Sequence, residues 1–202
     1  MSRYFVFLIL IILIFGSCKN KSSEKAIDKN NFIIDLQPFD GITAAQTQYV
    51  FNELKKSYAF VEIKKSIPLP QSAYYPARNR YRADSIINIL DNQAAAWHKI
   101  IGLTSKDIST TKNSIEDWGV MGLGFCPGKA CIASTFRLSK SEINEQLFKV
   151  AIHEAGHTFG LPHCPVKTCF MRNADGGNPT NEEKEFCTKC KSFLLKHGWT
   201  LQ

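Results

Sequence analysis

The chain has 202 residues, of which 44% are hydrophobic and 21% are charged, and its net charge is +7 at pH 7. This composition excludes wholesale disorder, and the length suits one domain with a substantial core. The excess lysines are dispersed, for example at Lys55 and Lys56, which is typical of a solvated exterior. We therefore expect no nucleic-acid partner.

The N-terminal segment has the pattern of an export signal. An apolar run over residues 4–15 follows Arg3 and ends shortly before Cys18. The run is too short for a comfortable membrane span and has the length of a signal-peptide core. We expect residues 1–17 to be a signal peptide whose end resembles the lipobox of bacterial lipoproteins, with a lipid on Cys18. An uncleaved anchor and a plain secretory signal are the alternatives.

Residues 18–31 are polar and rich in Lys, Ser and Asn, so they predict a flexible, lipidated tether. The remaining residues, 32–202, are expected to form the single folded domain. With a lipid on Cys18, this domain would be held to the membrane at the bacterial cell envelope, outside the cytoplasm, as a monomer.

The first half of the domain alternates between predicted strands and helices. Strands are expected at residues 32–36, 58–67 and 98–103, and helices at residues 43–57 and 82–97. In the first helix, for example, Ala45, Tyr49, Val50 and Leu54 recur at helical spacing. A strand-helix-strand-helix-strand order implies crossover connections and a largely parallel sheet.

Two further extended segments, residues 119–126 and 130–136, predict a hairpin at the sheet edge. They flank Pro127 and Gly128, a pair that suits a type II turn. An edge strand beside a cleft could bind an extended peptide by strand addition, although an edge that only packs is an equally good interpretation. Cys126 and Cys131 bracket the turn and could form a disulfide, the alternative being two free buried thiols.

Capping boxes occur at two places, Ser139 with Glu142 and Thr180 with Glu183. The first predicts a helix that begins near residue 140 and ends at Gly160, because glycine readily takes the left-handed conformation that ends a helix. The second predicts a C-terminal helix that carries Cys187 and Cys190 and ends near Gly198.

The segment HEAGHTFGLPH at the end of the first of these helices is arranged like a catalytic metal site. His153 and His157 lie one turn apart on one helix face, and the turn at Gly160 brings in His163 as a third ligand. Three histidines leave a fourth position on a zinc ion for water, whose pKa falls to about 7. Glu154 can take the proton as that water attacks a carbonyl. The residues thus predict zinc-dependent peptide hydrolysis.

Four further cysteines have the spacing of a structural zinc site. They are Cys164, Cys169, Cys187 and Cys190, which form a Cys-x4-Cys pair followed by a Cys-x2-Cys pair. Four thiolates close the coordination sphere of a zinc ion, so the site would have no catalytic role. Two disulfides are the rival interpretation for an exported domain. We expect two zinc ions per chain, one catalytic and one structural.

The segment HEAGHTFGLPHCPVKTCFM, followed by CTKC, resembles the archaemetzincins, a branch of the metzincin metalloproteases. The resemblance implies catalytic zinc on the three histidines, Glu154 as general base and structural zinc on the four cysteines. It also implies that Met171 forms the Met-turn, which packs beneath the metal without binding it. The implied fold is α/β and metzincin-like, with a twisted, mostly parallel sheet, an edge hairpin, an active-site helix and a C-terminal helix that carries the structural zinc site.

A zinc metallopeptidase acting on peptide or protein substrates is therefore the leading hypothesis. The alternative is a non-catalytic, zinc-stabilised module that binds a peptide or partner, although such a module gains nothing from the glutamate. Hydrolysis of a non-peptide amide would share every motif. Exopeptidase action would need a free-amine site, for which Glu116 and Asp117 are candidates, or a carboxylate site. Arg78, Arg80 and Arg82 could hold a carboxylate or simply face solvent.

Overall fold

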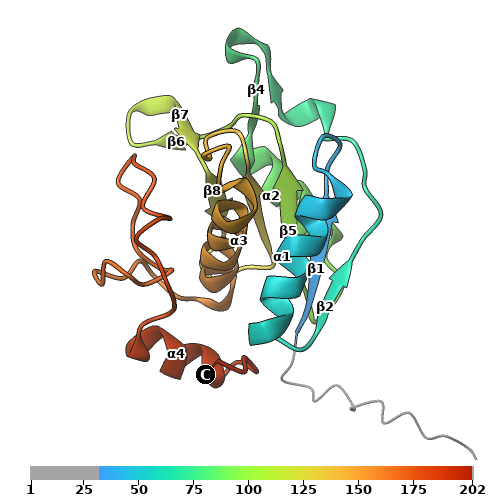
Figure 1. Ribbon diagram of the computed structural model, residues 1–202. Coiled ribbons are helices and arrows are strands. Elements are labelled where there is room, and N and C mark those ends of the chain that lie inside the picture. Colours follow the sequence, from blue (N-terminus) through green and yellow to red (C-terminus); the bar gives the residue numbers. More distant parts are fainter. Residues whose placement is uncertain (1–31, 202) are drawn as a thin grey trace, which may run out of the picture.

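The computed structural model describes residues 32–201 of the chain. The expected signal peptide, the tether and Cys18 lie outside these residues. Figure 1 shows a central sheet with α1 and α3 on one face and α2 on the other. The α/β architecture predicted from the strand and helix pattern is confirmed.

The main sheet has five strands in the order β2-β1-β5-β9-β8. These are β1 (Ile33–Pro38), β2 (Val61–Ile63), β5 (His98–Thr104), β8 (Gly122–Gly124) and β9 (Ala130–Ser134). The first four in spatial order are parallel, and β8 runs antiparallel to β9 at the edge. The predicted parallel sheet with an edge hairpin is therefore present.

A second, four-stranded sheet was not foreseen from the sequence. It has the order β3-β4-β6-β7 and consists of β3 (Tyr74–Tyr75), β4 (Arg80–Arg82), β6 (Ile108–Lys112) and β7 (Ile115–Val120). Two short 3-10 helices, Gln71–Ala73 and Pro76–Arg78, lie on either side of β3. The strand predicted at residues 119–126 is split, because β7 pairs with β6 in this sheet and β8 pairs with β9 in the other.

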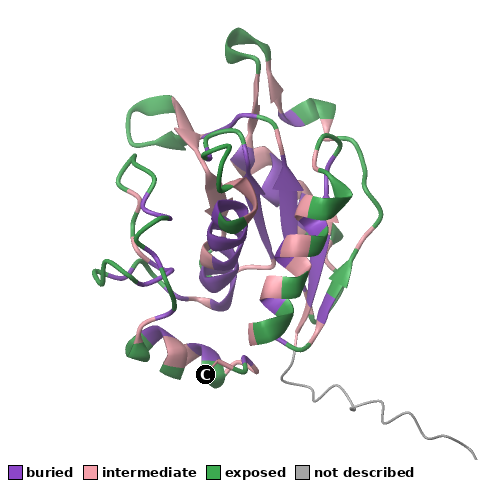
Figure 2. Ribbon diagram, viewed as in Figure 1, coloured by how far each residue is buried: buried purple, intermediate pink, exposed green. Residues whose placement is uncertain are grey.

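The four α-helices are α1 (Ala44–Ser57), α2 (Ala83–Gln93), α3 (Ile143–Phe159) and α4 (Thr188–Leu195). Side chains of α1 and α3 share one hydrophobic cluster with Leu36 and Leu103, whereas those of α2 share another with Ile132 on the opposite sheet face. Figure 2 shows that α3 is buried along most of its length. Burial on nearly all sides fixes α3 firmly in the core. None of the helices within residues 32–201 has the length and apolar composition that a membrane span needs.

The active-site helix begins later than predicted and ends where predicted. It starts at Ile143, and the backbone N–H of Ser139 donates to Gln146 Oε1 at 2.9 Å, so the expected Ser139–Glu142 capping box is not formed. At the other end, Gly160 has a φ of 106° and caps α3 in the left-handed conformation. The C-terminal end of the helix was thus correctly located.

The C-terminal helix is shorter than predicted at both ends. It begins at Thr188, because the Thr180 hydroxyl donates to Asn178 Oδ1 at 2.7 Å instead of capping a helix. It ends at Leu195 instead of near Gly198. Cys187 is therefore the N-cap residue of α4, and Cys190 lies in its first turn.

The turn between β8 and β9 also differs from the prediction. The Cys126–Pro127 peptide bond is cis, and among the described residues Gly128 is not one of the glycines with positive φ, so a type II turn is wrong. Cys131 lies opposite Gly124, which places Cys126 beyond the paired residues. Both thiols are free, Cys126 exposed and Cys131 buried, and the expected disulfide between them is not formed.

Candidate metal centre and active site

Three histidines converge at the C-terminal end of α3. The Nε2 atoms of His153 and His157 lie 3.1 Å apart, and the His163 ring lies 4.8 Å from the His157 ring, measured between centroids. One nitrogen from each histidine lies within 4.8 Å of the other two. Zinc bound tetrahedrally at about 2.1 Å separates its nitrogen ligands by about 3.4 Å, so these residues fit that ion.

Backbone carbonyls set the orientation of two of these rings. His153 Nδ1 lies 2.5 Å from the carbonyl oxygen of Phe170, and His157 Nδ1 lies 2.7 Å from that of Leu161. Since a carbonyl oxygen only accepts, each Nδ1 carries the proton and each Nε2 is free to bind a metal. Burial lowers the pKa of His153 to about 3 and also lowers the pKa of His157 and His163. At neutral pH all three are therefore in the neutral form that ligates metals.

Met171 packs directly beneath the histidine-bearing turn of α3. It is fully buried, and a Cβ added at Gly156 would lie 2.5 Å from its Sδ atom. Only a glycine leaves room for the thioether at this point, between His153 and His157 on the helix. The arrangement agrees with the Met-turn role implied for Met171. The matching role of Gly156 was not identified from the sequence.

Glu154 lies beside the histidines and against the edge strand β8. A Cβ added at Gly122 would lie 2.6 Å from Glu154 Oε1, and one at Gly124 would lie 3.3 Å from Oε2. Burial raises the pKa of Glu154 to about 8, and the residue is 7% exposed. Neither glycine was identified from the sequence as part of the site, although glycine within a strand is a known sign of close approach. Together they leave a slot for the carboxylate between helix and sheet.

The four cysteines predicted as a second site also come together. One Sγ from each lies within 4.8 Å of the others, and the Sγ atoms of Cys164 and Cys187 are 3.6 Å apart. The backbone N–H groups of Met171 and Cys187 donate to Cys169 Sγ at 3.5 and 3.3 Å. Tetrahedral zinc with bonds of about 2.3 Å separates its sulfur ligands by about 3.8 Å, so the thiols fit this ion. All four thiols are free. Zinc binding requires free thiols, whereas the alternative of two disulfides would leave none.

One loop connects the histidine cluster to the cysteine cluster. Within it, Cys169 supplies a thiol, Phe170 supplies the carbonyl that orients His153, and Met171 packs beneath α3. The Cys164 N–H donates to the Met171 carbonyl at 2.7 Å, which closes the loop on itself. The position of the histidines therefore depends on the geometry of the cysteines.

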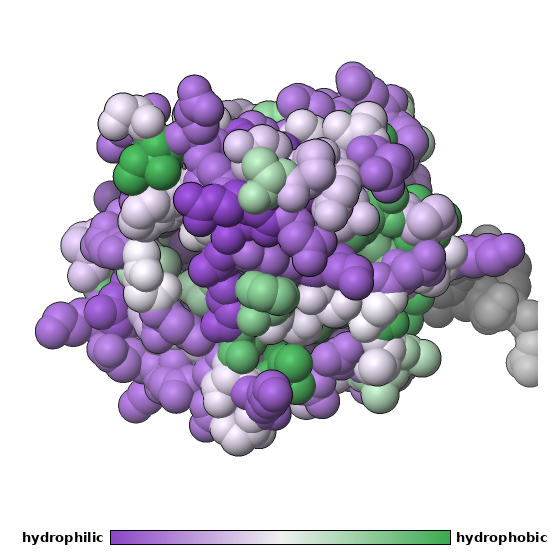
Figure 3. Space-filling model, turned by 90° about the horizontal axis from the view of Figure 1, so that it is seen from above, coloured by the Kyte–Doolittle hydropathy of each residue, from purple (hydrophilic) through white to green (hydrophobic). Residues whose placement is uncertain are grey.

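A cavity of about 850 Å³ opens over the histidines and Glu154. Its walls come from β7, β8, α3 and the loop over residues 172–180. Viewed from above in Figure 3, hydrophilic side chains dominate the surface, with small hydrophobic patches between them. The volume lies within the usual range for sites that hold small ligands or a few residues of a peptide. Because β8 is an edge strand, its outer side faces no other strand of the main sheet.

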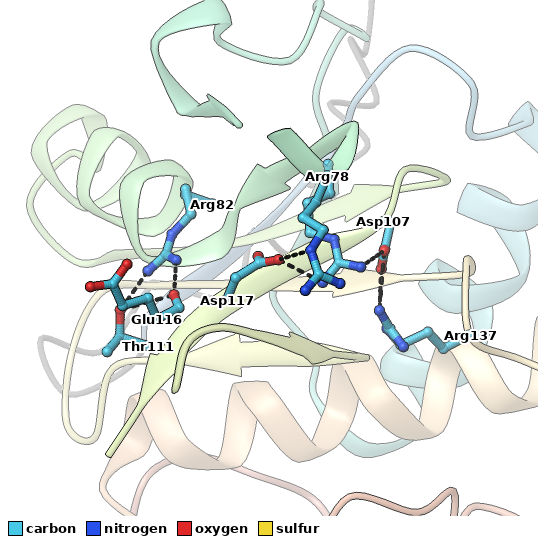
Figure 4. Close-up of polar contacts among 8 residues, drawn as sticks. Arg78, Arg82, Asp107, Thr111, Glu116, Asp117 and Arg137 are labelled. Atoms are coloured by element: carbon cyan, nitrogen blue, oxygen red, sulfur yellow. Dashed lines mark hydrogen bonds and ion pairs between the residues drawn. The ribbon is translucent and has the colours of Figure 1, made fainter. Parts of the chain in front are cut away.

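The three arginines of residues 78–82 lie outside the cavity lining. Arg80 pairs with Asp107 at 3.1 Å and with Asp117 at 3.3 Å, and Arg82 pairs with Asp84 at 2.8 Å. Figure 4 shows Arg82 also reaching Thr111 and Glu116. Neither arginine is placed to hold a substrate, because the ion pair of Arg80 with Asp117 and the hydrogen bonds of Arg82 to Thr111 and Glu116 tie β4 to β6 and β7.

Arg78, Glu116 and Asp117 were the other residues considered for binding the ends of a peptide. The side chain of Arg78 is 66% exposed and approaches Asp117 at 3.8 Å, so it largely faces solvent. Asp117 faces arginines and not the cavity, and Glu116 is also outside the lining, so neither forms a free-amine site. The arginines that do line the cavity are Arg137 and Arg172, and Arg137 Nη2 donates to Asp107 at 2.8 Å (Figure 4).

The wall of the cavity beyond Glu154 contains a second buried carboxyl group, Glu183. It is 4% exposed, and burial raises its pKa to about 7 while the positive charges of Lys149 and Arg172 act in the opposite direction. The folded protein therefore keeps this proton up to a higher pH than the unfolded chain does. It follows that the favourable contribution of Glu183 to stability is complete below about pH 4.5 and is lost as the pH rises to about 7.

The Glu183→Gln variant tests this pH dependence. Relative to the variant, the wild type should lose roughly 3 kcal/mol of unfolding free energy between pH 4.5 and 7, measured by urea denaturation of zinc-loaded protein. Taking the difference between the two proteins removes the pH dependence of the metal sites. Glu53→Gln is the matched control, since Glu53 pairs with Lys56 on α1 outside the cavity lining and should not change the slope. Parallel curves for wild type and Glu183→Gln would contradict the buried, protonated state.

Comparisons with known proteins agree with this geometry. The model of peptidase family M54 matches residues 59–196. The archaemetzincin of Methanopyrus kandleri is 32% identical over 142 residues, which cover 67% of this chain and 79% of that protein. The crystal structure of an archaemetzincin from Methanopyrus kandleri has a TM-score of 0.70 at 26% identity and covers 83% of this chain and 96% of that one. For an Archaeoglobus fulgidus archaemetzincin complexed with malonate, the TM-score is 0.67, the identity 27% and the coverage 80% and 99%.

Proposed function

The chain belongs to peptidase family M54 and is a zinc metalloprotease, and we propose that it hydrolyses peptide bonds with Glu154 as the general base. One observation carries the proposal: the three histidines and Glu154 line the same wall of one large cavity. Such a grouping of neutral histidines and a buried carboxyl group suits the activation of water for attack on a carbonyl, because the charge of a bound Zn²⁺ would favour the ionised form of Glu154 that accepts the proton.

Each residue has a distinct task in this reaction. His153, His157 and His163 would hold a Zn²⁺ ion, which would act as a Lewis acid and lower the pKa of water at the site. Glu154 takes the proton from the attacking water and then gives it to the leaving amine. Its slot against Gly122 and Gly124 restricts the carboxylate to this position. The outer side of β8 offers backbone groups to which an extended peptide can bind as an added strand.

We propose further that each chain holds two zinc ions, the second on the four cysteines. The free thiols, their mutual spacing and the N–H groups directed at Cys169 support a structural role for that ion. Such a site has no open position for substrate, because four thiolates complete the tetrahedron. It would fix the loop that orients His153.

The proposed location rests on sequence alone. Residues 1–17 have the composition of a signal peptide, and Cys18 follows the small residues expected before a lipidated cysteine. We propose that the domain over residues 32–202 acts as a monomer outside the cytoplasm, held to the membrane by a lipid on Cys18 and a tether over residues 18–31. Its substrates would then be peptides or proteins of the cell envelope, with no part for nucleic acid.

Cleavage of a mixed peptide library tests the function directly. The zinc-loaded protein should cleave members of the library, lose activity when a chelator removes the metal, and regain it when Zn²⁺ is added back. Mass spectrometry of the products would also separate exopeptidase from endopeptidase action. Full metal content without cleavage of any peptide would contradict the proposal and would support the alternative, a zinc-stabilised module that only binds a peptide or partner.

A further inference from the structure

The cavity has a second polar wall, formed by Lys149, Thr180 and Glu183. Lys149 and Thr180 are joined, because Lys149 Nζ donates to the Thr180 carbonyl at 2.8 Å. Glu183 is 4% exposed, and no group of residues 32–201 donates a hydrogen bond to its carboxyl group or pairs with it. A carboxyl group that is buried at a cavity wall and lacks a partner is a candidate for contact with a ligand.

The charges around Glu183 leave it without a close counter-charge. Lys149 pairs with Glu145 at 2.7 Å, and Arg172 pairs with Glu182 at 2.8 Å. Each nearby cation therefore already has its own carboxylate, and neither forms an ion pair with Glu183. A positively charged ligand group in the cavity would give Glu183 the counter-charge that it lacks. A negatively charged ligand group would be repelled by the ionised form of Glu183.

The position of this wall relative to Glu154 indicates which part of a substrate reaches it. Lys149 and Val150 lie one turn before His153 and Glu154 on α3, whereas His157 and His163 lie on the other side of Glu154 along the chain. Val150 is close to the Glu154 carboxyl group, since a Cβ added at Gly122 would lie 2.8 Å from Val150 Cγ1 and 2.6 Å from Glu154 Oε1. Glu154 must reach the nitrogen of the scissile bond to protonate the leaving amine. In the proposed reaction, the side chain of the residue that contributes this nitrogen would lie on the side of Glu154 where Lys149 and Glu183 form the wall.

We infer that Glu183 selects a basic side chain, lysine or arginine, in the substrate residue that follows the scissile bond. This inference rests on the proposed function. The long aliphatic stem of such a residue passes Val150, and its charged end donates to the Glu183 carboxylate. The cation also favours the ionised form of the carboxyl group, so binding and ionisation support each other. Lys149 stays paired with Glu145 and bonded to the Thr180 carbonyl.

Two peptides that differ at one position test the selection. Both have the same sequence, with lysine in one and norleucine in the other after the bond that is cleaved, because norleucine has a similar stem without the charge. The wild type should cleave the lysine peptide with a kcat/KM at least about tenfold higher. In Glu183→Gln this ratio should fall to near one, because the lysine side chain loses the carboxylate that distinguishes it from norleucine. The ratio does not depend on the fraction of folded protein, since both peptides meet the same sample.

Glu53→Gln is the control and should keep the wild-type ratio, because Glu53 lies on α1 outside the cavity lining and pairs with Lys56. Equal cleavage of the two peptides by the wild type, an unchanged ratio in Glu183→Gln, or a preference for a glutamate peptide would overturn the inference. Binding of fluorescent versions of the peptides to Glu154→Gln, with and without Glu183→Gln, is measured in parallel. If no peptide is cleaved at all, the proposed function fails, and these binding affinities still decide whether Glu183 prefers lysine.

Discussion

Replacing Glu154 with glutamine should leave zinc on the histidines and lower kcat for peptide hydrolysis by at least about 100-fold. Glutamine has nearly the same shape, so it fits the slot against Gly122 and Gly124 without moving α3. It cannot accept a proton, however, and this removes the step that turns water into a nucleophile and returns the proton to the leaving amine. Metal analysis and steady-state kinetics on the same sample check both parts of the prediction.

A second Glu→Gln substitution, away from the active site, is the control for activity and zinc content. Glu53→Gln removes a carboxylate from α1 that pairs only with Lys56 on the surface, and it should retain full activity and full zinc content. Wild-type activity in Glu154→Gln would rule out the general-base role. Loss of zinc together with activity would instead indicate that Glu154 supports the histidines structurally.

The second large effect is expected from Cys169→Ser. The Cys169 thiol is fully buried, and its sulfur accepts hydrogen bonds from the backbone N–H groups of Met171 and Cys187. The substitution should therefore disrupt both the metal site and the backbone around it. We expect the zinc content to fall from two ions per chain toward one, with a loss of stability well above the ~1 kcal/mol of an ordinary substitution. Peptidase activity should fall too, because Phe170 and Met171 in the same loop hold His153 and α3 in place.

Cys126→Ser is the matched control, since Cys126 is exposed, free and outside the cysteine cluster. It should keep both zinc ions and the wild-type melting temperature. If the cluster forms two disulfides instead, the purified wild type would hold one zinc ion, and thiol titration of the unfolded protein would find none of the four cysteines reduced. That result would contradict the structural zinc site while leaving the catalytic site untested by this pair alone, so the Glu154 experiment is run beside it.

The histidine cluster was predictable because its geometry is mostly local. His153 and His157 are four residues apart, so helical periodicity places them on one face of α3. Gly160 ends the helix at the predicted residue. The parallel order of β1, β5 and β9 likewise follows from the alternation of strands and helices. Each of these features depends on a short segment whose own sequence pattern is enough to predict it.

Features that depend on partners distant in sequence were missed. The capping box predicted at Ser139 is not formed because the backbone N–H of Ser139 donates to the Gln146 side chain. The one predicted at Thr180 is not formed because the Thr180 hydroxyl donates to the Asn178 side chain. The second sheet was not foreseen because its strands are short and partly polar, and ion pairs such as Arg80 with Asp107 help to hold them together. The cavity wall at Glu183 appears only when the segment after Met171 is folded back against α3.

The loop shared by the two clusters also imposes an order on the maturation of the protein. The three histidines are synthesised before Cys169, Cys187 and Cys190, so α3 can form while the support for His153 is still missing. A nascent chain therefore has its zinc-binding helix before it has a stable site. Hydrolytic activity should consequently appear late, after Cys190 joins the cluster, which would limit cleavage of other proteins during synthesis.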